Sequence, residues 1–548
     1  MAHALAGKPV QEQDIIDVQT IVDAYFDNVP DMTNPTQLVS FGTSGHRGTS
    51  VDGTFTDLHV AAITQAICDG RKQFGATGPI FVGQDTHALS QPALVTVLEV
   101  LAGNGVTAMV DCDMAFVPTP SVSRAIIRYN EEHDDKADGI IITPSHNPPD
   151  NGGIKYNTII GGPADTVVTK WIEMRANEYL TAYCESEDFK RISIDNIEPT
   201  AQVPYDYKGL YVEELGDVIN MEAIKAAGPK VLVDTLGGSG ASYWNAIKER
   251  YGLDLTIIHD DYDPTFSFMT YDHDGKVRMD CSSTYVMTSV INRIGDFDLA
   301  VGNDPDYDRY GIVVSSGLIS ANTFLTLAAR YLFTTRGWKN KGVGKTVVCT
   351  TMIDKWAADA DIPVFEVPVG FKYFSQLLFD GAIGIGGEES AGASFLKKDG
   401  TVWTTDKDGM IMALLSMEIM AVMGKSALKM ADEFVEEFGN PSFGRIDAPC
   451  KKEQKQILKQ MSAELITATT VDGDPIMNIR TTSLYNDMPI DGVRVETDKG
   501  WFVARPSGTE DLYKIYGESY KGDLGLVALL TAGEEIVNAA LNGTIETE

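Results

Sequence analysis

Short apolar runs that end abruptly in loops rich in glycine, aspartate or serine recur along this chain and restrict its fold more than any other feature. Examples are residues 80–82, 140–142, 231–233, 299–301 and 382–385. Strands that are buried on both faces have this appearance. Stretches of helical length separate them at residues 91–103, 243–250, 322–335 and 408–424. The pattern predicts repeated α/β units.

The loops after these runs are candidate site loops. In open α/β sheets, ligands bind beyond the carboxyl ends of the strands. The loops GQDT, TPSH, DTLGG, GNDPDYD and GGEES lie at those ends.

The last hundred residues have another pattern. Residues 494–496 and 502–504 flank a short turn, which predicts a β-hairpin, and helical stretches lie at 451–466 and 524–541. A separate α+β domain is expected here. The length of 548 residues implies three to five folding units. Charged or proline-containing stretches indicate breaks near 185–207, 316–322 and 438–450.

Charge excludes two classes of partner. Lys plus Arg is 44 and Asp plus Glu is 78, which gives a net charge of −34. Such a surface repels nucleic-acid backbones and anionic membranes, so neither is expected as a partner.

The cysteines and the apolar segments indicate a cytoplasmic protein. The six cysteines form no CxxC pair, which is typical of a reducing compartment, and the N-terminal segment lacks the pattern of a secretory signal. The most apolar segment, 410–423, is shorter than the ~20 residues that cross a bilayer, so we expect it to be a buried helix.

The loop at 143–149 contains a candidate nucleophile, Ser145, beside His146. Pro148 and Pro149 rule out a helix there and hold the serine on a stiff turn. With a base and a group that neutralises charge, such a serine can attack or carry a phosphoryl group. An ordinary polar turn is the alternative, and this loop alone favours it.

The loop at 302–309 contains three alternating carboxylates, Asp304, Asp306 and Asp308. These groups repel one another unless a cation binds them, and Mg²⁺ is the usual choice for phosphate chemistry. A calcium loop of the EF-hand type is excluded, because Arg309 and Ser315 stand where glycine and glutamate are required. A solvated acidic turn is the alternative, and the buried-looking strand before the loop favours the metal site.

Two further loops suit a sugar phosphate. Adjacent carboxylates and a hydroxyl in GGEES fit vicinal sugar hydroxyls, although a helix N-terminus has the same composition. In RPSGTE, an arginine fork, two hydroxyls and a glycine can surround a phosphate dianion. Arg47 lies between glycines in GTSGHRG, and Lys398 lies in a second cationic loop that is usually just a solvated turn.

Several common enzyme classes lack their motifs. The sequences GKT and GKS lack the leading glycine of the Walker A pattern, six positions before the lysine, so neither is a Walker A loop. There is no GxGxxG after a strand, no HExxH helix and no GxSxG elbow.

The ordered motifs GTSGHRG, TPSHNPP with NGGIKY, GNDPDYDR, GGEES and RPSGTE resemble those of the α-D-phosphohexomutase superfamily, and in particular its bacterial phosphoglucomutases. The resemblance covers nearly the whole chain. It implies three related α/β domains with mixed sheets plus a C-terminal α+β domain, arranged around a central cleft. The expected domains are 1–205 with the phosphoserine loop, 206–320 with the metal loop, 321–440 with the sugar loop and 441–548 with the phosphate loop.

The resemblance also implies a role for each motif. Ser145 matches the phosphorylated serine, and Ser145, Asp304, Asp306 and Asp308 match the Mg²⁺ ligands. Glu388 and Ser390 match the sugar loop. The phosphate loop is matched by Arg505, Ser507, Gly508 and Thr509. Cations near the reacting phosphate are matched by Arg47, His146, Lys155, Arg309 and Lys398, among which Lys155 is the expected proton shuttle. His46 replaces a residue that is aliphatic in many members, and the metal loop departs from the more usual DGDADR.

The implied reaction is the interconversion of glucose 1-phosphate and glucose 6-phosphate through glucose 1,6-bisphosphate, in a monomer or homodimer. The expected cations would have to gather in one cleft of this acidic protein. A phosphomannomutase or a dual-specificity phosphohexomutase is the alternative within the class, and a phosphoglucosamine mutase is less favoured. A metal-dependent sugar phosphatase and a catalytically silent sugar-phosphate binding protein are the alternatives from other classes.

Overall fold

The computed structural model describes residues 2–42, 44–184, 189–506 and 512–545. They form two compact units. The first unit comprises Met1–Ala321, Phe374–Ala382 and Ser390–Leu428. The second comprises Asn322–Tyr373, Ile383–Glu389 and Lys429–Glu548.

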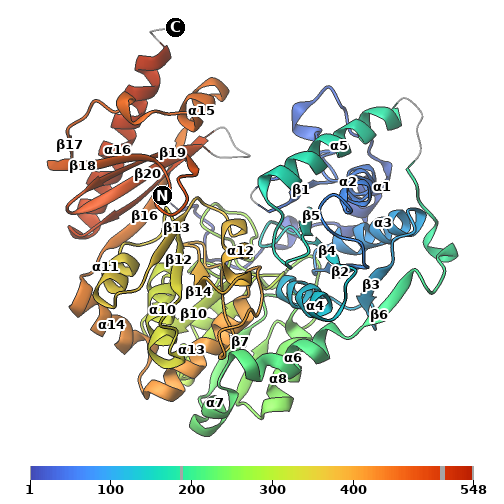
Figure 1. Ribbon diagram of the computed structural model, residues 1–548, viewed down its shortest axis with the longest axis horizontal. Helices are drawn as coiled ribbons and strands as arrows, with labels where there is room; N and C mark the ends of the chain where they lie inside the picture. The colour runs from blue at the N-terminus through green and yellow to red at the C-terminus, as the bar shows by residue number, and fades with distance from the viewer. Residues whose placement is uncertain (1, 43, 185–188, 507–511, 546–548) are drawn as a thin grey trace. The chain divides into compact units, whose positions relative to one another are not determined.

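The first unit begins with a six-stranded mixed sheet in the order β1-β5-β4-β2-β3-β6 (Figure 1). Its strands are β1 His46–Thr49, β2 Ile80–Gln84, β3 Ala108–Asp111, β4 Asp138–Ile142, β5 Asn151–Asn157 and β6 Gln202–Tyr205. Strand β5 is antiparallel to both β1 and β4, and the other neighbours are parallel. The helices are α1 Val18–Asp27, α2 Asp57–Gly70, α3 Ser90–Gly103, α4 Thr119–Glu132 and α5 Thr166–Cys184.

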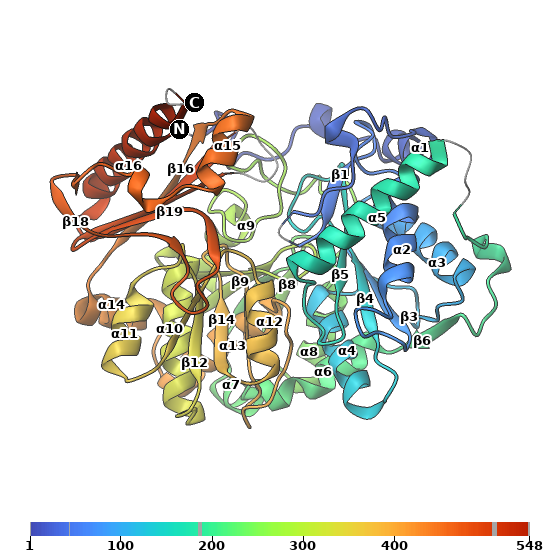
Figure 2. The same ribbon diagram turned by 45° about the horizontal axis from the view of Figure 1, so that its top comes forward.

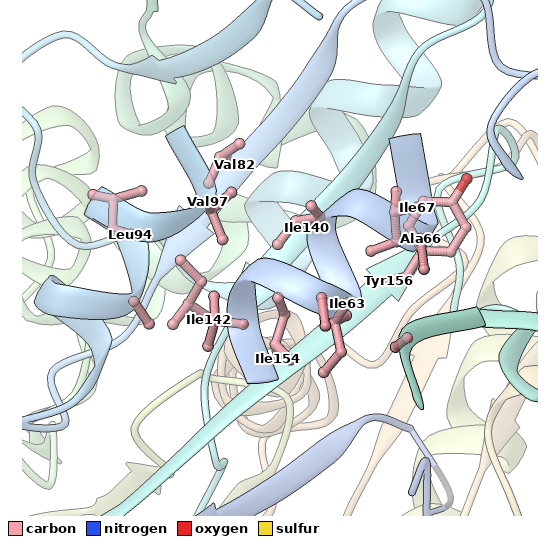
Figure 3. Packing of buried hydrophobic residues seen from close by; sticks show 14 of the residues in the cluster. Ile63, Ala66, Ile67, Val82, Leu94, Val97, Ile140, Ile142, Ile154 and Tyr156 are labelled. Atoms are coloured by element: carbon pink, nitrogen blue, oxygen red, sulfur yellow. The ribbon is translucent and has the colours of Figure 1, made fainter. Parts of the chain in front are cut away.

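Alternation along the strands sends apolar side chains to both faces of this sheet. Ile140, Ile142 and Ile154 pack against helices α2 and α3 on one face (Figure 3). Phe81 and Ile141 point to the other face and pack against α4. Burial on both faces fixes the strand register, so the carboxyl ends of β2 and β4 are held side by side.

Residues 206–320 contain a second mixed sheet, whose strand order is β11-β10-β9-β7-β8. Its strands are β7 Val231–Asp234, β8 Leu255–Ile258, β9 Leu299–Asn303, β10 Tyr310–Val314 and β11 Gly317–Leu318. The helices of this part are α6 Tyr207–Val218, α7 Met221–Ala227, α8 Ala241–Tyr251 and α9 Thr288–Ile291. Strands β7, β8 and β9 are parallel, and β10 is antiparallel to β9.

The next strands and helices are divided between the two units. In the second unit, β12 Gly342–Thr346 lies between β13 Val364–Val367 and β14 Ile383–Gly387, and all three are parallel. The first unit contains β15 Ala393–Phe395 and α13 Gly409–Met423. The remaining helices are α10 Ala321–Arg336, α11 Met352–Asp359, α12 Lys372–Phe379 and α14 Ala427–Phe438.

The C-terminal part of the second unit is an antiparallel sheet with helices on one face (Figure 2). Its order is β16-β21-β20-β19-β18-β17. The strands are β16 Ser442–Pro449, β17 Thr470–Val471, β18 Asp474–Thr482, β19 Pro489–Thr497, β20 Gly500–Pro506 and β21 Leu512–Ser519, and the helices are α15 Lys452–Lys459 and α16 Gly522–Ile545. Polar contacts tie this sheet to β13 and to the start of α11: Arg480 Nη1 lies 2.7 Å from Glu366 Oε1, and Thr351 N donates to Glu518 Oε1 at 3.0 Å.

Helix α16 has an apolar stretch, Gly522–Asn542, that is long enough to cross a bilayer by length and composition. Leu529, Leu530 and Val537 in that stretch are buried in the core of the C-terminal sheet together with Phe502. The burial of these side chains explains the apolar composition of α16, because a helix in the core of a domain has the same composition.

Most of the elements expected from the sequence are confirmed, and one is wrong. The five apolar runs are strands, and the hairpin forms with Arg494 opposite Val503. The helix expected over 451–466 ends at Lys459. Ser462 accepts a hydrogen bond from Glu464 N and caps a new 3₁₀ turn, which interrupts the helix. The domain boundaries expected at 205, 320 and 440 stay predictions.

Candidate active site

Ser145 lies after β4 on a turn that the surrounding structure holds in an unusual conformation. Its φ is 60°, which lies in the left-handed region of backbone conformation that residues other than glycine rarely adopt. The Ser145 N–H donates to Thr143 Oγ1 at 2.7 Å, and the residue is only 1% exposed. Such a backbone costs about 1–3 kcal/mol and persists only where neighbouring contacts fix it.

Asp85, at the end of β2, is the centre of those contacts. Its carboxylate accepts hydrogen bonds from Thr143 Oγ1 at 2.6 Å, Ser90 Oγ at 2.5 Å and His87 Nδ1 at 2.8 Å. His87 Nε2 lies 3.0 Å from the Asn147 carbonyl oxygen. The network therefore holds the serine loop on both sides of Ser145, at Thr143 and at Asn147.

Asp85 and His87 shift each other's pKa values toward the charged forms. Burial lowers the pKa of His87, but the adjacent Asp85 carboxylate outweighs burial and raises that pKa above its ordinary value. Burial raises the pKa of Asp85, but the His87 charge and the donated hydrogen bonds hold it below its ordinary value. Sequence reasoning noted the GQDT loop but did not assign a role to Asp85 or His87.

Asp304, Asp306 and Asp308 lie after β9 and are completely buried. One carboxylate oxygen of each lies within 4.8 Å of the others. Ser145 Oγ donates to Asp304 Oδ2 at 2.9 Å. The expected convergence of the serine hydroxyl with the three aspartates is therefore confirmed.

Two lysines bridge the acidic cluster. Lys155 Nζ, from β5, lies 2.5 Å from Asp306 Oδ2 and 3.0 Å from Asp308 Oδ2. Lys407 Nζ lies 2.7 Å from Asp308 Oδ2. Burial would raise the pKa of Asp308, but these two ammonium groups outweigh it and hold the pKa well below its ordinary value.

Asp304 is in a different electrostatic position. Burial raises the pKa of Asp304 well above its ordinary value, and the neighbouring charges of Asp306 and Asp308 raise it further. The lysine contacts go to Asp306 and Asp308 rather than to Asp304, and a bound cation would favour the ionised form of all three carboxylates.

The oxygens of the cluster fit a divalent cation. Asp306 Oδ1 and Asp308 Oδ1 are buried and have no hydrogen-bond partner among the described residues. A buried carboxylate oxygen without a donor is costly, and hard oxygen donors are what Mg²⁺ and similar cations bind. The fit rests on these two oxygens together with the Ser145–Asp304 contact.

Arg309, His146 and Arg47 belong to the same unit. Arg309 Nη1 lies 3.7 Å from Asp280 Oδ2, and Arg309 Nε lies 3.9 Å from Asp308 Oδ1. His146 Nδ1 lies 3.3 Å from Ser145 Oγ, and burial together with the Arg309 charge lowers its pKa well below the ordinary value. The Arg47 guanidinium donates weakly to Ser44 Oγ at 3.4 Å, and no described carboxylate lies within 4.0 Å of it.

The structure corrects the prediction for Lys398. This residue is exposed, and its Nζ lies 3.5 Å from the Ile219 carbonyl oxygen rather than on the aspartates. Lys407 contacts the cluster instead. Both lysines begin a Lys-Asp-Gly triplet, but only the second triplet directly precedes the long apolar helix α13. The position of the second triplet at the start of α13 was the sequence signal that could have distinguished Lys407 from Lys398.

The loop that carries Lys407 is fixed at both ends. Thr405 N donates to Ser123 Oγ at 3.2 Å, and Asn157 Nδ2 donates to Asp406 Oδ2 at 2.9 Å. Asp408 caps α13 and also accepts a hydrogen bond from Tyr211 OH. Lys407 is therefore placed by buried polar contacts on either side.

The sugar-loop residues lie in different units. Glu388 comes after β14 in the second unit and is 7% exposed, and Ser390 belongs to the first unit and is half-buried. Ala391 next to it has a φ of 66°, which makes this a tight turn.

Only part of the expected phosphate loop lies within the described residues. Arg505 is on β20 and half-buried, and its Nε is buried with no hydrogen-bond partner in the described part of the chain. Ser507, Gly508 and Thr509 lie outside the described residues.

Comparison with known families matches four domain models to this chain. They are described as the α/β/α domains I, II and III and the C-terminal domain of phosphoglucomutase/phosphomannomutase, and they match residues 38–182, 210–317, 320–438 and 447–524.

Named relatives and solved structures agree with these matches. A phosphoglucomutase of Komagataeibacter xylinus is 46% identical over 539 residues, which cover 97% of each chain. The structure of pp63/parafusin, a phosphoglucomutase from Paramecium, has a TM-score of 0.72 at 20% identity and covers 94% of this chain and 96% of that one. An Aspergillus fumigatus N-acetylphosphoglucosamine mutase, solved with GlcNAc-6P and magnesium, has a TM-score of 0.52 at 15% identity over 96% of this chain and 99% of that one. The two structures share the fold, and the 46% identity extends over almost the full sequence. The chain therefore belongs to the phosphoglucomutase/phosphomannomutase family, whose members are metal-dependent mutases.

Proposed function

We propose that this protein is a phosphoglucomutase that interconverts glucose 1-phosphate and glucose 6-phosphate through a phosphorylated Ser145 and glucose 1,6-bisphosphate. The observation that carries the proposal is the Ser145 hydroxyl, which donates to Asp304 at 2.9 Å beside two buried carboxylate oxygens that lack donors. The relative that shares 46% identity over nearly the whole chain bears this name.

Asp304, Asp306 and Asp308 would hold Mg²⁺, the divalent cation that most commonly serves phosphoryl transfer. The bound ion would offset negative charge on the phosphoryl group. The two unpartnered oxygens of Asp306 and Asp308 and the high pKa of Asp304 support a cation at this position.

In the transfer step, a sugar hydroxyl oxygen forms a bond to phosphorus while the bond from Ser145 Oγ to phosphorus breaks. Oγ would take up a proton from the Lys155 ammonium group, and the proton that the sugar hydroxyl loses would restore that group. Lys155 is our candidate proton carrier, because its ammonium group lies on Asp306 and Asp308 at the centre of the site. Arg309 and Arg47 would neutralise the phosphate, and His146 would help to orient it.

Recognition of the substrate would rest on other loops. Glu388 and Ser390 would bind sugar hydroxyls, and Arg505 with Ser507, Gly508 and Thr509 would hold the phosphate that is not being transferred. The unpartnered Nε of Arg505 supports this role.

The proposed setting is the cytoplasm, with sugar phosphates as the partners and a monomer or homodimer as the working form. The described cysteines, Cys68, Cys112, Cys281, Cys349 and Cys450, are free thiols, which is consistent with a reducing compartment.

Two measurements on the purified protein test the proposal. Intact-mass analysis after incubation with glucose 1,6-bisphosphate should show one added phosphoryl group, and it should map to the peptide that contains Ser145. Isomer should form from glucose 1-phosphate faster than from mannose 1-phosphate and without equivalent release of inorganic phosphate. Phosphate release at the rate of isomer formation would establish a phosphatase instead, and faster turnover of the mannose substrate would establish a phosphomannomutase.

A further inference from the structure

Thr119, the first residue of α4, makes two contacts with the metal loop that sequence reasoning did not predict. Its backbone N–H donates to the Asp306 carbonyl oxygen at 2.9 Å, and its hydroxyl donates to Asp306 Oδ2 at 2.9 Å. Thr119 is completely buried. Thr119, from a helix that packs on the first sheet, thus holds both the backbone and the side chain of Asp306, which follows a strand of the second sheet.

The position of Thr119 is fixed before it meets Asp306. Val117 N donates to the Gln84 carbonyl oxygen at 2.9 Å, which ties the approach to α4 to the end of β2. Pro118 and Pro120 flank Thr119 and restrict the backbone at the start of the helix. The N-terminus of a helix also favours a negative charge, which suits a carboxylate there.

The contact decides which oxygen of Asp306 remains free. Oδ2 lies within hydrogen-bonding distance of both the Thr119 hydroxyl and Lys155 Nζ, whereas Oδ1 is buried and has no partner among the described residues. Without the hydroxyl, Lys155 alone would hold Oδ2, and the orientation of the carboxylate about its Cβ–Cγ bond would be less restricted. We infer that Thr119 is a positioning residue, which orients Asp306 so that Oδ1 is presented to the divalent cation.

This inference rests on the proposed metal site and adds a residue that is not a ligand. Residues that orient a ligand typically change metal affinity by 10–100-fold when they are replaced.

Ser239 offers a matched control. It is also buried and also bonds the metal loop, but its N–H and hydroxyl both reach the Pro305 carbonyl oxygen at 2.8 Å. Ser239→Ala therefore removes a buried hydrogen bond to the same loop without touching a carboxylate oxygen.

The test is the dissociation constant for Mn²⁺ or Mg²⁺, measured by calorimetry on the unphosphorylated full-length protein without substrate. We expect Thr119→Val to weaken cation binding by about 10–100-fold, and Thr119→Ser and Ser239→Ala to stay within about threefold of wild type. Thr119→Ala provides a second loss of the hydroxyl if the valine variant does not fold. At saturating cation, the kcat of Thr119→Val should recover toward wild type.

Wild-type affinity in the folded valine and alanine variants would refute the positioning role and leave the metal site intact. An equal loss in Ser239→Ala would also refute it, because general loosening of the loop would then explain the effect. A wild-type protein that binds no divalent cation would overturn the metal site itself and the inference with it.

Discussion

The region of Ser145 and the aspartates in the first unit and the region of Arg505 in the second unit are built in opposite ways. Ser145 is buried in a strained turn that Asp85, Thr143 and His87 hold in place. Arg505 is half-buried and leaves its Nε without a partner in the described part of the chain.

The difference fits the tasks that we propose for the two regions. A group that transfers phosphoryl must be oriented before the substrate arrives, since positioning and charge neutralisation supply most of the catalysis. A group that only holds a phosphate can leave its donor unpaired until the ligand supplies the acceptor. Substitutions in the first region should therefore reduce kcat, and those in the second should raise KM.

Ser145→Ala is the strongest test of this division. Removing the hydroxyl removes the phosphoryl acceptor, so we expect turnover to fall by about 10,000-fold or more while substrate binding is kept. Steady-state kinetics and calorimetry with glucose 6-phosphate measure the two effects. Substantial turnover in this variant would place the nucleophile elsewhere.

Lys407→Met and Lys398→Met form a matched pair inside the first unit. Lys407 neutralises Asp308 at 2.7 Å, so we expect its loss to lower kcat by about 100-fold. Lys398 is exposed and lies on the Ile219 carbonyl, so its replacement should change kcat by less than about twofold. The reverse order would restore Lys398 to the site and contradict the placement of Lys407.

The two lysines also show which parts of the site local sequence patterns can predict and which they cannot. The strands, their order along the chain and the loops at their carboxyl ends are local patterns, so the serine and the three aspartates could be found from them. The two Lys-Asp-Gly triplets are identical and differ only in their flanking residues. Only the fold shows that Thr405 and Asp406, which directly precede the second triplet, are bonded to Ser123 and Asn157.

Asp85 and Thr119 were missed for a related reason. Neither belongs to an unusual motif, and each acts by a contact with a residue far away in the sequence: Asp85 with Thr143, and Thr119 with Asp306. Long-range side-chain contacts depend on how the sheets are placed, which no local pattern encodes.

Arg505→Ala tests the proposed role of Arg505 in substrate binding. We expect KM for glucose 1-phosphate to rise by about tenfold with a small change in kcat, because the guanidinium fork is lost from phosphate binding alone. Arg445→Ala is the control, since Arg445 is exposed on the same sheet and pairs with Asp447. A fall in kcat with unchanged KM would show that Arg505 acts in the chemical step.

The smallest expected effect is a difference between the two units in how their folding stability depends on acid pH, and it does not involve the catalytic step. His46 and His59 stack at 5.3 Å in the first unit, and burial lowers their pKa values to about 4 and about 3. Between pH 6.5 and 4 the unfolded chain binds protons that the folded pair does not, so stability falls as pH falls, by about 3 kcal/mol for His46 alone. In the second unit, burial raises the pKa values of Glu366 and Glu496, but arginines outweigh it and hold both below the ordinary value, so this stabilisation is lost only as pH falls below about 4.5. Hydrogen exchange at pH 5.5, corrected for intrinsic rates, should show the first unit losing protection before the second, and His46→Gln should reduce that loss. Simultaneous loss in both units, unaffected by the substitution, would contradict the assignment to the histidines.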